Sequence, residues 1–111
     1  MEVLRDFEQT AIELLTRDVL SPEVLAEFKR SAEFVSCKHT GYGYFLTLRH
    51  PKLPEKRVVC HRPTLIGVSE GIETGFVIFL ENHELTLECH SWGDETVPDN
   101  YRERHVEVTA T

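Results

Sequence analysis

Apolar residues recur at helical spacing in the first part of the chain. Between Glu2 and Val19 they return every three or four positions, which is typical of an amphipathic helix with one buried side: Val3, Leu4, Phe7, Ala11, Ile12, Leu14 and Leu15. Ser21-Pro22-Glu23 then predicts the start of a second helix, because serine caps helices and proline fits the first helical position. This shorter helix is expected to end near Ser31.

From Glu33 onward the apolar period changes to two, which predicts strands whose alternate side chains face opposite sides of a sheet. A two-residue turn at Gly41-Tyr42, with glycine first, favours a type II′ hairpin. This register places three pairs on one mostly apolar face: Val35 with Leu48, Cys37 with Leu46, and His39 with Tyr44. The opposite face then holds polar residues, so the pattern supports the register.

A second hairpin is predicted from residues 76–80 and 85–90. A turn at Asn82-His83 suits type I′ geometry, because both residue types tolerate a positive φ better than most. The resulting pairs are again apolar: Leu80 with Leu85, Ile78 with Leu87, and Phe76 with Cys89. The same register places two glutamates, at 81 and 84, opposite each other, which is mildly unfavourable.

Shorter strands are predicted at 57–61, 64–69 and 105–109, and residues 70–75 are expected to form a turn region. The whole pattern predicts an α+β fold with two N-terminal helices packed on one face of an antiparallel sheet of about five or six strands. With 111 residues, the chain is expected to form a single domain, residues 1–111. Residues 1–31 would be helical and residues 33–110 mainly sheet.

The net charge of −7 is distributed unevenly along the chain. Residues 1–33 contain eight acids and four bases, residues 34–69 one acid and six bases, and residues 70–111 ten acids and two bases. One interpretation is that the basic middle pairs with the acidic ends across the fold. The other is a polarised surface that steers a charged partner. Nucleic acid is not expected as a partner, because most of its binders are basic.

Three cysteines, Cys37, Cys60 and Cys89, each have a histidine nearby in the sequence. In a strand, adjacent residues point to opposite faces, so Cys60-His61 and Cys89-His90 are not expected to share a metal. We therefore predict no metal site, no cofactor and no catalytic residue. Cys60 lies on a weaker predicted strand and could be exposed, so it would be a better nucleophile than Cys89 if the protein were an enzyme.

The segment from Ser91 to Tyr101 is the most informative loop. It combines two aromatic residues with three acids, a composition found in interface hot spots. We predict that five of its residues contact a protein partner: Trp92, Asp94, Glu95, Asp99 and Tyr101. The alternative is that Trp92 and Tyr101 fold back over the edge of the sheet.

No apolar run is long enough to span a bilayer, and the first residues do not resemble a secretion signal, so a cytoplasmic protein without membrane association is expected. The function predicted from these features is a small, acidic, non-catalytic domain that binds a basic protein, as inhibitors, immunity proteins and chaperones do. Two alternatives stay open. The chain could be a homo-oligomeric structural or regulatory domain, or a small enzyme or metal-binding protein that uses its histidines and cysteines.

Overall fold

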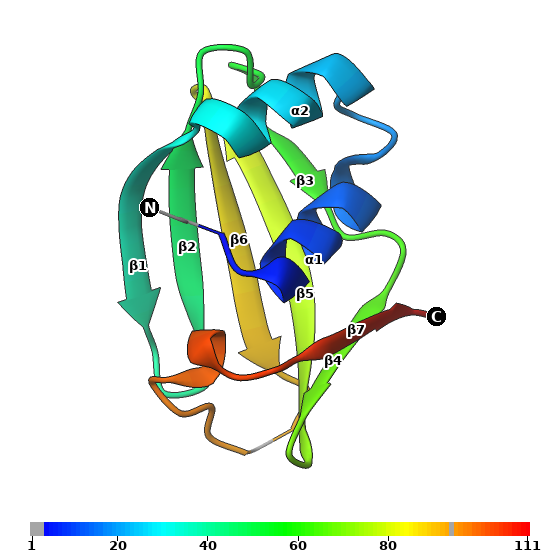
Figure 1. Cartoon of the computed structure of the whole chain (residues 1–111), viewed down its shortest axis with the longest axis vertical. Helices are drawn as coiled ribbons and strands as arrows, with labels where there is room; N and C mark the ends of the chain where they lie inside the picture. Colours follow the sequence, from blue (N-terminus) through cyan, green and yellow to red (C-terminus); the bar gives the residue numbers. More distant parts are fainter. Residues whose placement is uncertain (1–3, 94) are drawn as a thin grey trace.

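The computed structural model describes residues 4–93 and 95–111 of the chain. Within these residues, two helices lie on one face of a seven-stranded sheet (Figure 1). The elements are α1 (Asp6–Thr16), α2 (Pro22–Ser31), β1 (Glu33–His39), β2 (Gly43–Arg49), β3 (Val58–Cys60), β4 (Leu65–Ser69), β5 (Ile72–Glu81), β6 (Glu84–Ser91), the 3-10 turn η1 (Tyr101–Glu103) and β7 (Glu107–Ala110). The predicted α+β fold is therefore confirmed, with a sheet slightly larger than expected.

Every pair of neighbouring strands is antiparallel. The strand order is β1-β2-β6-β5-β4-β7, and β3 also pairs with β5. Along one edge, the last residues of the long strand β5 pair with β3 and its first residues pair with β4. Along its other edge β5 pairs with β6. None of the helices in the described residues is long and apolar enough to cross a membrane.

The helix start predicted at Ser21 is confirmed. Its hydroxyl oxygen accepts a hydrogen bond from the backbone N–H of Val24 at 3.2 Å, and Pro22 occupies the first turn. The first helix is shorter than the pattern predicted, since α1 begins at Asp6 and ends at Thr16. The Thr16 carbonyl accepts the N–H groups of Val19 and Leu20, so the chain turns there.

In the first hairpin, two of the three predicted pairs are confirmed, Cys37 with Leu46 and His39 with Tyr44. The third is wrong, because the register shifts between Phe34 and Ser36 and Phe34, not Val35, pairs with Leu48. Such a bulge inserts one extra residue that a strict period of two does not reveal.

All three pairs predicted for the second hairpin are confirmed. Asn82 and His83 both have positive φ, 53° and 63°, as a type I′ turn requires. The turn predicted over residues 70–75 is much shorter than expected. Glu70 (φ 50°) and Gly71 (φ 84°) reverse the chain, and β5 already starts at Ile72.

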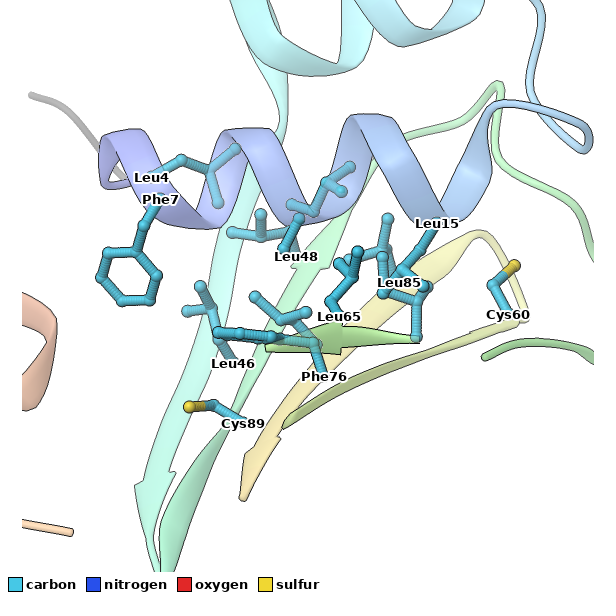
Figure 2. Packing of buried hydrophobic residues seen from close by; sticks show 14 of the residues in the cluster. Leu4, Phe7, Leu15, Leu46, Leu48, Cys60, Leu65, Phe76, Leu85 and Cys89 are labelled. Carbon is cyan, nitrogen blue, oxygen red and sulfur yellow. The ribbon is translucent and has the colours of Figure 1, made fainter. Parts of the chain in front are cut away.

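The core lies between α1 and the sheet. Figure 2 shows Phe7 and Leu15 pointing from the helix toward Leu46, Phe76 and the other leucines of the strands. Burial of this apolar surface is the main force that holds the helix on the sheet. Cys89 is buried as predicted, but Cys60 is only 5% exposed, so the expectation of an exposed thiol there is wrong.

Candidate functional site

Three chain segments meet at one end of the sheet, at the bottom of Figure 1: the β1–β2 turn, the β4–β5 turn and the loop that follows β6. Backbone hydrogen bonds join them. The N–H groups of Ser91 and Val97 donate to the carbonyls of Tyr42 and Gly41, at 2.8 and 2.9 Å, and the Trp92 N–H donates to the Glu73 carbonyl at 3.1 Å. We call the exposed side chains here the acidic end: Tyr42, Glu70, Glu73, Trp92, Glu95 and Asp99.

Trp92 is both exposed and held in place. Its side chain is 51% exposed, yet its ring meets the His90 imidazole edge-on, with centroids 5.6 Å apart. Both rings lie over Gly75, where an added Cβ would come within 2.7 Å of His90 Nε2 and 3.0 Å of Trp92 Cε2. The glycine therefore makes the space in which the indole packs against the sheet, and the rest of the ring stays open to solvent.

A small cavity of about 150 Å³ lies beside the indole. It is lined by Gly71, Glu73, Ser91, Trp92, Gly93 and Glu95. Within residues 4–93 and 95–111, neither Glu73 nor Glu95 forms an ion pair. In the described part of the chain, the cavity is thus lined by Trp92 and by two glutamates that form no ion pair.

The five predicted partner-binding residues differ in their exposure to solvent. Trp92, Glu95 and Asp99 are exposed at the acidic end, whereas Asp94 lies outside the described residues. Tyr101 is fully buried, so it does not belong to the surface on which we placed it. For this residue the alternative interpretation, folding back onto the sheet, fits the structure.

The Tyr101 ring packs edge-on against Phe7 of α1, with centroids 6.0 Å apart. Its hydroxyl lies 3.0 Å from the Thr74 Oγ1 on β5. Burial raises the pKa of this phenol, as expected when the charged form loses its hydration. Tyr101 therefore anchors the end of loop 92–100 to the core.

A buried polar cluster that the sequence did not reveal lies next to this anchor. Glu8 on α1 is completely buried, and its Oε2 accepts hydrogen bonds from the Tyr44 hydroxyl and the Arg102 Nε, each at 2.6 Å. The Arg102 Nη2 also donates to Oε1 at 2.8 Å. The hydrogen bond to Glu8 raises the pKa of Arg102. The pKa of Tyr44 is raised mainly by burial and, to a smaller extent, by the charge of Glu8.

One signal for this cluster is present in the sequence. Glu8 lies four residues after Leu4 and four before Ile12, on the apolar side of the first helix. A carboxylate in that position must find a partner when the helix packs, because an unpaired buried charge is very costly. The pattern nevertheless does not identify Arg102 as the partner.

The basic segment 34–69 pairs with acids at the other end of the molecule. Arg49 of β2 contacts Glu84 of the neighbouring strand β6 at 2.7 Å. Arg57, just before β3, contacts Glu81 of β5 at 3.3 Å, and Lys52 contacts Glu27 of α2 at 3.0 Å. Pairing across the fold therefore occurs, as one interpretation predicted. These three ion pairs lie away from the acidic end. At the acidic end itself, Arg104 pairs with Glu70 at 2.9 Å.

The cysteines lie in surroundings that disfavour the thiolate. Burial raises the pKa of all three thiols, that of Cys89 to about 12. A raised thiol pKa lowers the fraction of the reactive thiolate at neutral pH. Among the residues that the structure describes, no group of three His, Cys, Asp or Glu side chains could hold a metal ion.

Comparisons of this chain with protein-family models, with curated proteins and with solved structures give no match. The fold and the site together define an α+β domain with an exposed aromatic and acidic surface at one end of its sheet. The functional inference is therefore drawn from the geometry of this acidic end.

Proposed function

We propose that the chain is a non-catalytic protein-binding domain whose acidic end engages a basic protein. The observation that supports this most directly is Trp92, half exposed and yet fixed against His90 and Gly75. Tryptophan is enriched among the residues that dominate binding energy at protein interfaces. A large indole that is already ordered loses little conformational entropy when a partner covers it.

The charges around Trp92 favour a basic partner. Glu73, Glu95 and Asp99 are exposed, and no ion pair involves them within the described part of the chain. An unbalanced patch of one sign attracts a complementary surface and accelerates association at low ionic strength. The ion pairs of Arg49, Lys52 and Arg57 lie at the opposite end. At the acidic end Arg104 pairs with Glu70, and this pair does not include Glu73, Glu95 or Asp99.

The test is affinity capture with four forms of the purified chain as bait: the wild type, Trp92→Ala, the double variant Glu73→Gln/Glu95→Gln, and the control Glu23→Gln/Glu55→Gln. The control has the same net charge as the double variant, but its changes lie on α2 and in the loop before β3. A captured protein is then purified, and its affinity for each form is measured by calorimetry at two salt concentrations.

The proposal expects one basic protein that the wild type and the control capture equally. Its affinity should fall about tenfold or more with Trp92→Ala, as for an interface hot spot, and should weaken with added salt. Binding that is equal for all four forms would place the interface elsewhere on the molecule. Absence of any basic protein that binds the wild type in preference to Trp92→Ala would overturn the proposal.

A further inference from the structure

The cavity beside Trp92 has the chemistry of a receptor for one organic cation. We propose that it is a pocket for an arginine side chain of the partner, a step that rests on the function proposed above. Trp92, Glu73 and Glu95 line the same small space. A cation there would meet the negative face of an aromatic ring and two opposite charges at once.

The volume of the cavity limits what can enter it. Its volume of about 150 Å³ is below the roughly 300–1,000 Å³ of pockets that hold a drug-sized ligand. This space suits the planar end of one side chain and not a helix or an extended peptide. The partner therefore inserts a single residue here, while the rest of its surface lies against the exposed parts of the acidic end.

Arginine fits these walls better than lysine does. The guanidinium group is flat, stacks on aromatic rings and presents paired N–H donors to a carboxylate, whereas an ammonium is a compact and strongly hydrated charge. Glu73 on β5 and Glu95 in the loop approach the cavity from different segments, so a fork of several donors can reach both. The glycines 71 and 93 that also line the cavity add no side chain that would block entry.

The backing of the indole makes the pocket rigid. The backbone N–H of Trp92 donates a hydrogen bond to the backbone carbonyl of Glu73 at 3.1 Å. This bond fixes the two lining residues relative to each other. His90 and Gly75 lie against the ring of the tryptophan. A wall held in this way is prepared for stacking before the ligand arrives, and this reduces the entropic cost of binding.

The test uses three blocked tripeptides, acetyl-Gly-X-Gly-amide, in which X is arginine, lysine or citrulline. Citrulline keeps the flat shape of arginine but has no charge, so it separates charge from shape. Each peptide is titrated into the isotopically labelled wild-type chain, and the backbone amide shifts of Gly71, Ser91 and Gly93 are followed. The indole N–H of Trp92 gives an additional signal, since it is the single tryptophan of the chain.

The arginine peptide should bind with a dissociation constant in the millimolar range and shift the signals around the cavity. Lysine should bind several times more weakly and citrulline at least about tenfold more weakly. Glu73→Gln and Glu95→Gln should each weaken arginine binding about threefold or more, while Glu55→Gln should leave it unchanged. Far-ultraviolet circular dichroism of each variant checks that the fold is kept.

Three results would overturn the arginine pocket: no shifts at the cavity, equal binding of citrulline, or a preference for lysine. The proposed function has a separate outcome. If a basic partner depends on Trp92 in the capture experiment but no arginine peptide binds, the acidic end is an interface without this pocket. If the peptide binds but no partner depends on Trp92, the pocket is present and the proposed function fails.

Discussion

The carboxylate of Glu8 and the guanidinium of Arg102, 94 positions apart in the chain, form a paired contact inside the protein, at 2.6 and 2.8 Å. The Glu8 side chain is completely buried and that of Arg102 is 15% exposed. The pair joins α1 to the 3-10 turn that ends loop 92–100. It therefore connects the hydrophobic core to the segment that forms part of the acidic end.

Removing Arg102 should strongly destabilise the fold. Arg102→Met leaves the Glu8 carboxylate buried without its cation, and breaking a buried pair in this way costs about 3–5 kcal/mol. The measurement is urea denaturation at neutral pH. The control is Arg30→Met, because Arg30 is 69% exposed and lies 3.9 Å from Glu27. That change should alter the free energy of unfolding by no more than ~0.5 kcal/mol.

The combined replacement Glu8→Leu/Tyr44→Phe/Arg102→Met tests the same explanation from the other side. It removes the charge pair together with the hydroxyl that donates to Glu8, so that only the half-buried Arg5 N–H, which donates to Glu8 Oε1 at 2.9 Å, loses its acceptor. We expect this triple variant to be more stable than Arg102→Met alone, since apolar replacements of whole buried pairs are often tolerated. A triple variant that is less stable than the single one would contradict the explanation.

The fold should lose stability in alkali, starting near pH 9. The pKa of Cys89 rises from 9.0 to about 12 because the thiol is buried, so the unfolded chain releases this proton at a lower pH than the folded one. The stabilisation is therefore complete below pH 9 and is lost as pH rises toward 12. At pH 10.5 this thiol alone should lower the free energy of unfolding by about 2 kcal/mol relative to its value below pH 9, at 1.36 kcal/mol per pKa unit.

Urea denaturation between pH 8 and 11 measures this effect. Cys89→Val should show a shallower loss of stability between pH 9 and 10 than the wild type. Above pH 10 the wild-type curve should steepen, because burial also raises the pKa of the Tyr44 and Tyr101 phenols. Identical slopes for wild type and Cys89→Val from pH 9 to 10 would show that the Cys89 thiol is not responsible.

Local chemistry explains why much of the sheet could be predicted from the sequence. Gly41 and Asn82-His83 have the positive φ values that tight hairpin turns require, and each turn fixes the pairing of the strands beside it. The bulge at Val35 could not be predicted, because an extra residue in one strand leaves the alternating pattern nearly unchanged. The start of β5 at Ile72 was also not predicted, because the composition of Ile72-Glu73-Thr74-Gly75 resembles that of a turn.

The candidate site could be predicted only in part. Trp92 and Glu95 were found because aromatic and acidic residues lie together in one loop. Glu73 was missed as part of the site, because it comes from a different strand and joins the loop only through the antiparallel pairing of β5 with β6. Tyr101 was misplaced on the surface for the same kind of reason, since its burial depends on contacts with Phe7 and Thr74 from distant parts of the chain.

Gly75→Ala should displace Trp92 without unfolding the protein. The new Cβ would lie 2.7 Å from His90 Nε2 and 3.0 Å from two atoms of the indole, so one or both rings must move. Such overpacking typically costs about 1–3 kcal/mol. We expect a shift in tryptophan fluorescence emission and weaker binding of the arginine peptide. Gly93→Ala is the matched control for the fluorescence measurement, because an added Cβ there meets nothing within 4 Å; equal spectra for both variants would contradict the packing.

Fluorescence quenching can test the electrostatics of the acidic end without a partner. Trp92 is the only tryptophan of the chain and is 51% exposed, so its emission reports on this surface alone. At a constant ionic strength of about 0.1 M, caesium should quench it more efficiently than iodide, after correction for the intrinsic efficiencies of the two ions with free tryptophan amide. Glu73→Gln/Glu95→Gln should reduce this preference markedly.

The control for that measurement is Glu23→Gln/Glu55→Gln, which removes two charges at positions away from Trp92. Because exposed charges act over about one Debye length, ~10 Å at 0.1 M salt, these distant changes should leave the preference for caesium almost intact. If the two double variants reduce it equally, the net charge of the whole chain governs the quenching. The carboxylates beside the indole would then have no special effect, and the local field on which basic-partner binding depends would be absent.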